Sequence, residues 1–284
     1  MTNCIVCGNF TTRGLAPWHA ICPVCRYESA ALAPTINDAQ AHERLNEADR
    51  EAGLRAIRAE NFRAIADAAR AHARPGARTL LDVGCAHGWF LEQAGRHFEV
   101  LGMEPDQAVA ARTGARGLAV RCGYFPDALR LDELFDVIVF NDVIEHIPDI
   151  GGALAACHAR LRDDGLLVLN LPNSGGLFYR LAKLLTHCGW RQPFERLWQK
   201  GLPSPHVHYF NSANLTALLR RHGFRLQLRR ELPAVRASGL LARLRCTGDS
   251  GALVQYASYA AVLCMLPLLR LFPSDIVVCL FRKE

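Results

Sequence analysis

The chain has 284 residues, of which 50% are hydrophobic and 21% are charged, and its formal net charge at pH 7 is +6. A chain of this length and composition buries a complete α/β core and leaves room for one small additional module, which excludes a disordered protein. Arginine supplies almost all of the positive charge, since Lys183, Lys200 and Lys283 are the only lysines, and no dense basic block occurs. Charge alone therefore gives little support for nucleic-acid binding.

Four of the eleven cysteines form two closely spaced pairs, Cys4-x-x-Cys7 and Cys22-x-x-Cys25. The start of the chain has neither the basic residues nor the apolar core of a signal peptide, so we expect a cytoplasmic, reducing environment. There, two such pairs predict a structural, tetrahedral zinc ion, with a redox dithiol as the alternative. Residues 1–34 are therefore predicted to form a zinc-ribbon-like module that depends on its metal for folding.

Residues 35–75 are predicted to form a helical linker. Pro34 precedes a charged helical tract that runs from Asn37 to Arg74, and Pro75-Gly76 ends it. We expect this helix to pack against the domain that follows.

From Arg78 onward, apolar runs alternate with helical patterns, which predicts a parallel sheet with helices on both faces. The predicted strands lie at 79–83, 99–103, 118–122, 135–140 and 166–170, and two more follow a helix at 212–222, at 224–229 and 276–281. The third unit is thus residues 76–284, with insertions predicted at 173–210 and 233–273.

A glycine-bounded turn follows the first of these strands. The run Thr79–Val83 leads into Gly84 and Gly88, and a helical pattern comes next, so backbone N–H groups converge on one point where a polar cofactor can bind. Glu104 ends the next apolar run, at a spacing that suits a carboxylate bound to two ribose hydroxyls. The nicotinamide fingerprint G-x-G-x-x-G is absent, because Ala86 and Trp89 stand at its second and third glycines.

The turn resembles motif I of the class I S-adenosylmethionine (SAM) methyltransferases, usually Asp-x-Gly-x-Gly-x-Gly and here Asp82-Val-Gly84-Cys-Ala86-His-Gly88. A second segment, 135–149, resembles the family's fourth strand followed by a Glu-His turn. The resemblance covers about 75–230 and 275–282. It implies a Rossmann-like seven-stranded sheet whose last strand is antiparallel and lies between the fifth and sixth. Ala86 departs from the usual middle glycine, so we expect a strained turn there.

The same resemblance implies where SAM binds. Residues of the turn would surround its amino-acid portion, Glu104 and the adjoining Pro105 its ribose, and Gly123 and Tyr124 its adenine. The family often has an acid at the position of Tyr124, and an aromatic ring there predicts stacking instead. The remaining cofactor contacts are predicted at the end of the fourth strand. The predicted cofactor residues are Asp82, Gly84, Cys85, Ala86, Gly88, Glu104, Pro105, Gly123, Tyr124, Asn141 and Asp142.

His146 is the candidate catalytic base, because imidazole titrates near neutral pH and the residue follows the fourth strand directly. Glu145 would orient either His146 or the acceptor, and the alternative is that both residues only stabilise the turn. His206 and His208 are two apart on an extended segment and so point the same way. They could contact the acceptor or a metal, or have a purely structural role.

The layout resembles bacterial glycan and secondary-metabolite methyltransferases, which often carry a CxxC module, the Glu-His turn and a segment like Pro205-His206-Val-His208-Tyr-Phe210. This implies an acceptor hydroxyl on a sugar, a lipid-linked glycan or another small molecule. One alternative is a zinc-ribbon RNA methyltransferase, although Asn141–Ile144 does not match the Asn/Asp-Pro-Pro-Tyr/Phe motif of base N-methylation. The other is a non-catalytic adaptor with a degenerate methyltransferase fold.

The second predicted insertion contains an unusual stretch, since residues 251–269 carry no charge and reach the length of a membrane span. A span is not expected, because the last strand must return to the same sheet. Two interpretations remain open: a buried helical hairpin that covers the sheet, or a helix that lies in the membrane plane and makes a peripheral contact on its inner face.

Overall fold

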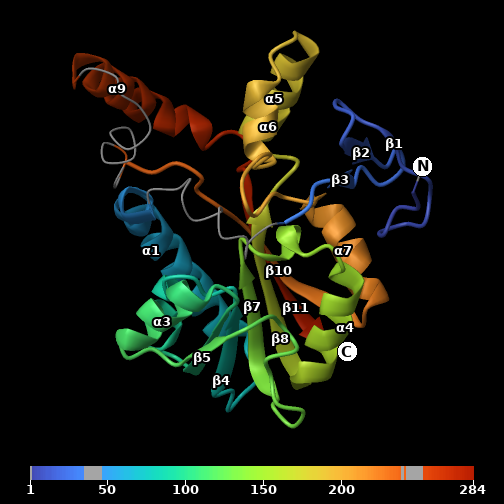
Figure 1. Cartoon of the computed structure of the whole chain (residues 1–284), viewed down its shortest axis with the longest axis vertical. Helices are drawn as coiled ribbons and strands as arrows, with labels where there is room; N and C mark the ends of the chain where they lie inside the picture. Colours follow the sequence, from blue (N-terminus) through green and yellow to red (C-terminus); the bar gives the residue numbers. More distant parts are fainter. Residues whose placement is uncertain (1, 35–46, 238–239, 241–251) are drawn as a thin grey trace.

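The computed structural model describes residues 2–34, 47–237, 240 and 252–284. A seven-stranded sheet forms its centre, in the order β10-β11-β8-β7-β4-β5-β6 (Figure 1). The strands are β4 (Thr79–Val83), β5 (Glu99–Glu104), β6 (Val120–Cys122), β7 (Phe135–Asn141), β8 (Leu161–Pro172), β10 (Phe224–Leu232) and β11 (Ile276–Lys283). The last strand, β11, runs antiparallel to both β8 and β10 and lies between them. The predicted methyltransferase-type fold is therefore confirmed.

Helices cover both faces of this sheet because successive strand residues point to opposite sides. Leu81 and Ile138 face one core, which α4 (Ile150–Arg160) and α7 (Ser212–Arg221) complete. Their neighbours Leu80 and Val137 face the other core, which the helices on the opposite side complete (Figure 1). Those helices are α1 (Glu47–His72) and α2 (Trp89–Ala94), while α3 (Gln107–Ala115) packs beside β5 and β6. The described part of the predicted linker helix, α1, thus packs on the sheet, while residues 35–46 of that prediction lie outside the described residues.

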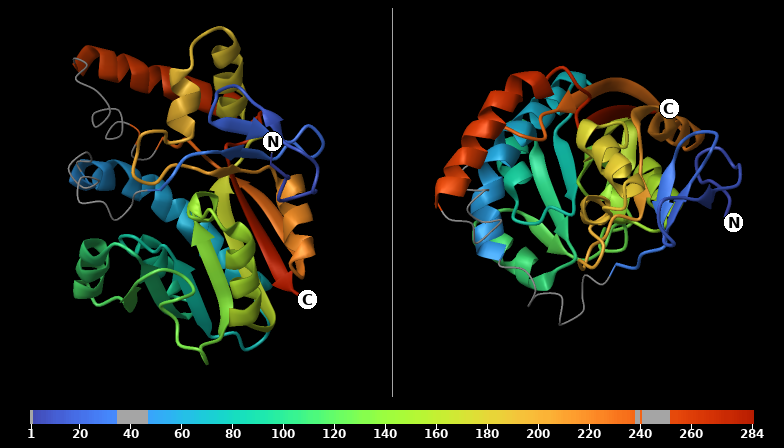
Figure 2. Two further views of the ribbon diagram at one scale, coloured as in Figure 1. Left: turned by 45° about the vertical axis from the view of Figure 1, so that its right-hand side comes forward. Right: turned by 90° about the horizontal axis from the view of Figure 1, so that it is seen from above.

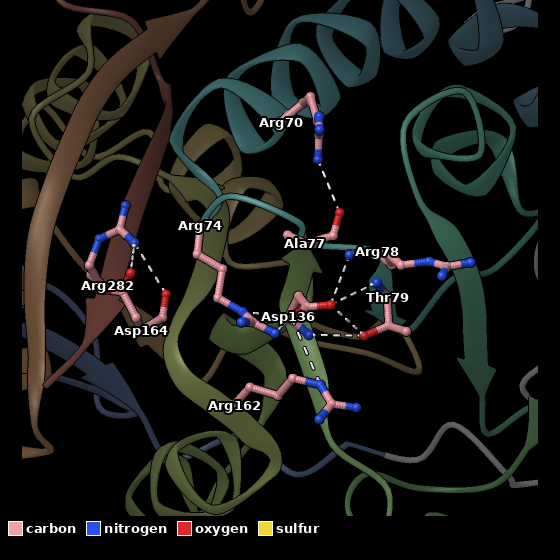
Figure 3. Close-up of polar contacts among 9 residues, drawn as sticks. All are labelled: Arg70, Arg74, Ala77, Arg78, Thr79, Asp136, Arg162, Asp164 and Arg282. Atoms are coloured by element: carbon pink, nitrogen blue, oxygen red, sulfur yellow. Dashed lines mark hydrogen bonds and ion pairs between the residues drawn. The ribbon is translucent and has the colours of Figure 1, made fainter.

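A buried carboxylate ties the end of α1 to the sheet. Asp136 on β7 accepts hydrogen bonds from the backbone N–H groups of Arg78 (2.9 Å) and Thr79 (3.0 Å) and from Arg74 Nε (2.8 Å), as Figure 3 shows. Burial opposes its ionisation, but these hydrogen bonds dominate and lower the pKa of Asp136 to about 2. The contact holds the loop after α1 and the start of β4 in register with β7.

The N-terminal cysteine module shares a sheet with the rest of the chain. Its strands β1 (Thr12–Arg13), β2 (His19–Ile21) and β3 (Glu28–Ala30) continue into β9 (His208–Tyr209), which comes from the first predicted insertion. Nothing in the sequence indicated this pairing, because a two-residue strand leaves no periodic pattern. The division of the chain into three units stays a prediction, but residues 1–34 do not stand apart from the remainder.

A salt-bridged carboxylate fastens the module further to the first insertion, which also holds α5 (Leu177–His187) and α6 (Gln192–Leu197). Glu28 accepts hydrogen bonds from Tyr179 Oη and Lys183 Nζ of α5, both at 2.8 Å, and its Oε2 lies 2.8 Å from His19 Nε2. Burial opposes ionisation of Glu28, yet the His19 hydrogen bond and the Lys183 charge lower its pKa. Module and insertion therefore form one packed unit.

The uncharged stretch of the second insertion forms α9 (Ala252–Leu269), which extends away from the sheet along one end of the molecule (Figure 2). Tyr256, Met265 and Leu268 are each more than half exposed, so the described part of α9 is not a buried hairpin. Residue 251 lies outside the described residues. Within the described ranges, no helix has the length and apolar character needed to cross a membrane.

Candidate active site

The turn after β4 has the backbone conformation of a tight binding loop. Gly84 and Gly88 both have φ of 72°, a region that favours glycine. A Cβ on Gly84 would lie 2.6 Å from a methyl carbon of Val143, and one on Gly88 would lie 2.5 Å from Leu118 Cδ1. Ala86 has φ of 44°, so the expected strain at the position of the family's middle glycine is present. Both glycines are therefore required by conformation and by space.

Glu104 serves the turn as well as facing a cavity. Its Oε2 accepts the N–H of Ala86 at 3.0 Å and its Oε1 accepts the N–H of Asp106 at 2.9 Å. The side chain is buried, which raises the pKa of Glu104. It lines a cavity of about 720 Å³ together with Pro105, Gly123 and Tyr124, three of the other predicted cofactor residues. The carboxylate oxygens keep further lone pairs with which to accept ligand hydroxyls.

A second, smaller cavity adjoins the motif I turn, and the buried Asp82 lines it. Asp82 is 1% exposed, and its Oδ1 accepts a 3.2 Å hydrogen bond from Asn141 Nδ2. Burial is the main cause that raises the pKa of Asp82 to about 8. A cationic ligand group beside it, such as an α-ammonium, would favour its ionised form. This cavity measures about 270 Å³, and Gly84, Cys85, Ala86, Asn141 and Asp142 also line it, whereas Gly88 lines neither cavity.

The two cavities are halves of one cleft, because they share Gly84, Asp142, Val143 and His146 along with the loop residues Pro203 and Ser204. The cleft lies at the carboxyl ends of β4, β5 and β7, which is where open α/β sheets bind ligands. Asp142 has φ of 55°, a strained conformation for a residue with a side chain. The sequence motifs predicted this position of the cleft.

His146 lines both cavities and carries a lone pair on one ring nitrogen. It belongs to the short 3₁₀ turn η2 (Ile144–His146), and its Nδ1 lies 2.9 Å from the carbonyl oxygen of Pro205. Because a carbonyl only accepts, Nδ1 carries the hydrogen and Nε2 carries the lone pair. Burial lowers the pKa of His146, so the ring is neutral at pH 7. The geometry therefore suits proton abstraction by Nε2.

The carboxyl group of Glu145 lies near Nε2 of this imidazole. Glu145 is 1% exposed, and within the described residues neither of its carboxyl oxygens has a hydrogen-bond partner. Burial, with a further contribution from the charge of Asp142, raises the pKa of Glu145 well above its usual value. Its Oε1 lies 3.9 Å from His146 Nε2. A neutral carboxyl at this distance keeps acceptor lone pairs that can stabilise a hydrogen on Nε2 when His146 gains a proton.

His206 and His208 pack against η2 and the residue after it. His206 stacks edge-on against His146 with ring centroids 4.7 Å apart, and Gln199 lies 2.9 Å from its Nε2. His208 uses both ring nitrogens, with Tyr27 Oη at 2.5 Å and the carbonyl oxygen of Ile147 at 2.9 Å. Both histidines are buried and neither lines the cavities. Glu145, His146 and His206 bring potential metal-ligand atoms within 4.8 Å of one another.

The four paired cysteines converge, and their sulfur atoms lie within 4.8 Å of one another. The Sγ–Sγ distance is 3.5 Å both for Cys4 with Cys25 and for Cys7 with Cys22. Zinc–sulfur bonds of about 2.3 Å place tetrahedral thiolates about 3.8 Å apart, so the cluster has the dimensions of a zinc site. A hydrogen bond from Asn9 is the main cause that lowers the pKa of Cys7 to about 6, whereas burial raises the pKa of Cys4 and Cys25, so the convergence of the four sulfur atoms is what indicates the metal site.

Three residues that line the cleft escaped sequence reasoning. Arg58 of α1 reaches it and lies 3.5 Å from Asp142. Gln199 and Ser204 come from the loop before β9. Arg58 sits in a helix without any binding motif, and the loop falls in an insertion that the family pattern does not describe, so neither carried a recognisable signal.

Comparison with known families identifies this cleft. A family model described as a methyltransferase domain matches residues 50–228, which is more than half of the chain and includes both motifs. The chain belongs to the class I SAM-dependent methyltransferases. The predicted family is therefore confirmed, and the family implies SAM as the methyl donor.

Curated relatives are similar over part of their length. The ubiquinone biosynthesis O-methyltransferase of Bradyrhizobium diazoefficiens is 32% identical over 114 residues, covering 38% of this chain and 45% of the relative. That of Paramagnetospirillum magneticum is 31% identical over 153 residues, covering 51% and 58%. The chain thus spans about half the length of these relatives.

Solved structures share the fold at low identity. A SAM-dependent methyltransferase from Thermotoga maritima is 17% identical and covers 85% of this chain and 97% of its own, with a TM-score of 0.55. The cyclopropane synthase MmaA2 from Mycobacterium tuberculosis is 20% identical and covers 78% and 83%, with a TM-score of 0.54.

Proposed function

We propose that this methyltransferase methylates a hydroxyl of a sugar, a lipid-linked glycan or another small molecule. The observation that carries the proposal is that His146, whose Nε2 carries a lone pair, lines the same two cavities as Gly84 of the motif I turn. The names of the curated relatives support an oxygen acceptor, since they are O-methyltransferases. The sugar or glycan acceptor comes from the family resemblance of the sequence.

The cofactor fits the cleft in one orientation. The larger cavity, with Glu104 and the half-exposed Tyr124, would take the ribose and adenine. The smaller cavity, with the turn and the Asp82–Asn141 pair, would take the amino-acid portion. The carboxyl group of that portion would find a cation in Arg58, which lines the same cavity. The acceptor would then enter beside Asp142 and His146.

SAM, when bound, supplies a methyl group on a sulfonium, so the protein mainly has to position the acceptor and remove its proton. His146 Nε2 would accept the hydroxyl proton as the oxygen forms its bond to the methyl carbon and the carbon–sulfur bond breaks. The resulting imidazolium would be stabilised by the carbonyl of Pro205, which accepts the Nδ1 hydrogen, and by an acceptor oxygen of the neutral Glu145 carboxyl near Nε2. His146 and Glu145 are thus the proposed catalytic pair.

The remaining site predictions fit this scheme as supporting roles. His206 and His208 contact His146 and the residue after η2 but line neither cavity. We therefore propose that they act on the acceptor through His146 and its turn rather than by direct contact. The cysteine cluster would hold a structural zinc ion. The exposed apolar side chains of α9, with Arg270 after it, support a peripheral membrane contact that would suit a lipid-linked acceptor.

Calorimetric titration with SAM tests the cofactor assignment. Glu104→Ala should weaken binding at least tenfold, because the buried carboxylate is lost from both the ribose site and the turn. Glu99→Ala is the matched control, since Glu99 lies on the same strand and its side chain is 65% exposed. Equal, weak heats for the wild type and both variants would instead indicate a non-catalytic adaptor.

Mass spectrometry tests the reaction itself. Glycolipid, small-molecule and RNA fractions are incubated with SAM and enzyme and searched for products that gain one methyl group. We expect the product in the glycolipid or small-molecule fraction, and its loss in His146→Ala with unchanged SAM affinity. Full turnover by His146→Ala would refute the base assignment, and a product in the RNA fraction would refute the acceptor class.

A further inference from the structure

One residue of the loop before β9 bridges the cysteine module and the catalytic turn. The carbonyl of Val207 accepts the N–H of Ala30 in β3 at 3.0 Å, and the N–H of Val207 donates to the carbonyl of Glu145 at 2.9 Å. Two backbone hydrogen bonds thus lead from the module's sheet to the turn that carries His146. Val207 is 5% exposed, so water does not compete for these bonds.

A side-chain connection runs parallel to this backbone bridge. His208 Nε2 lies 2.9 Å from the carbonyl of Ile147, which can only accept, so Nε2 carries the hydrogen. Nδ1 therefore accepts the hydroxyl hydrogen of Tyr27 at 2.5 Å. Tyr27 and His208 are both buried, and their contact joins residues 181 positions apart. The residue after η2 is in this way held by a residue of the module.

The outcome of both connections is the position of the Pro205 carbonyl. This carbonyl is the group that fixes the hydrogen of His146 on Nδ1 and leaves the lone pair on Nε2. Pro205 lies two and three residues before the bridging Val207 and His208, respectively. If that segment shifts, His146 loses the partner that selects its tautomer.

Order in the module depends on the cysteine site. Tyr27 follows Cys25 by two residues, and its carbonyl accepts the N–H of Cys22 at 2.8 Å. The strands of the module are two or three residues long. Such short strands cannot persist without a constraint, and the metal-sized cysteine cluster supplies one.

We propose that the metal-bound cysteine module positions the catalytic base, and that Tyr27 and His208 are the positioning residues that transmit this order to η2. The module then serves the active site by holding η2 and the Pro205 segment in position. This inference rests on the proposed role of His146. Filling the cysteine site should therefore control the tautomer of His146 while leaving the motif I turn intact, since that turn makes none of these contacts.

Histidine side-chain NMR on the full-length protein, labelled with ¹⁵N-histidine, tests the proposal without any acceptor. The zinc-loaded wild type should show His146 as a pure Nδ1–H tautomer and His208 as a pure Nε2–H tautomer. Removing zinc with a chelator, or the change Tyr27→Phe in the zinc-loaded protein, should convert His146 to a mixture of tautomers. SAM affinity should stay within twofold by calorimetry.

Two further variants separate positioning from general destabilisation. His208→Gln keeps a donor for Ile147 and an acceptor for Tyr27, so it should retain the His146 tautomer, whereas His208→Leu should lose it. Arg221→Gln is the control, because Arg221 ties the module to α7 through the carbonyl of Val6 (2.7 Å) and makes no contact with η2. This control should leave His146 unchanged.

An unchanged His146 signal after both zinc removal and Tyr27→Phe would overturn the proposal, as would an equal effect of Arg221→Gln. These outcomes are distinct from failure of the proposed function, which would appear as absent SAM binding or as full turnover by His146→Ala. Once the acceptor is known, Tyr27→Phe should lower kcat about 10- to 100-fold with little change in the KM for SAM.

Discussion

Replacement of Asp136 by asparagine should destabilise the fold measurably, because this carboxylate joins α1, β4 and β7. Its folded-state pKa is about 2 against an ordinary value of 3.8, a shift of about 1.8 units. At 1.36 kcal/mol per unit, the ionised form contributes about 2.5 kcal/mol to folding. The asparagine amide would also present N–H groups toward the N–H donors of Arg78 and Thr79. We therefore expect a loss of about 2–3 kcal/mol at pH 7.

The sign of the pH dependence follows from the direction of the shift. A lowered pKa gives stability that is fully present above about pH 4 and is lost as the pH falls through about 2. Urea unfolding of the wild type and Asp136→Asn at pH 7 and pH 3 measures it, and about half of the 2.5 kcal/mol should be lost at pH 3. Asp132→Asn, at an 86% exposed side chain, is the control. A difference below about 1 kcal/mol at pH 7, or one that does not change with pH, would refute the reasoning.

Other predictions follow from single residues of the site and module. Ala86→Gly should raise stability by up to about 1 kcal/mol in calorimetry, because it relieves the positive φ; a loss would contradict the strain. Glu28→Ala should lower urea stability by about 3 kcal/mol, since it leaves Lys183 unpaired beside a buried interface. Cys7→Ser should reduce bound zinc measured by atomic absorption. Because burial lowers the pKa of His146, methyl transfer should fall with decreasing pH at a midpoint below 6.5, the ordinary value of an imidazole; a midpoint above 6.5 would exclude this base.

Local sequence determined the fold class and much of the cofactor site. The apolar runs predicted all seven strands, because each strand is defined by a few consecutive residues that must be buried. The predicted strand at 166–170 is longer in the structure, from Leu161 to Pro172. Motif I and Glu104 were recognisable for the same reason, since the turn and the next strand end bring them together within about twenty residues.

The spacing of the paired cysteines also predicted a metal site. The contacts that join the cysteine module to the rest of the chain could not be predicted from the sequence. Tyr27 and His208 are separated by 181 positions, and Arg58 and Asp142 approach each other from different elements. No periodic pattern links such residues, because their contact depends on how α1, η2 and the insertion pack.

Burial was likewise decided by tertiary structure alone. Glu145 and His146 were chosen from a motif, yet their lack of solvent and the Pro205 carbonyl are what make the acid neutral and give the base one tautomer. The sequence determined the local motifs, because their residues are close together in the chain. Burial and long-range hydrogen bonds depend on the packing of distant segments, so only the tertiary structure decided them.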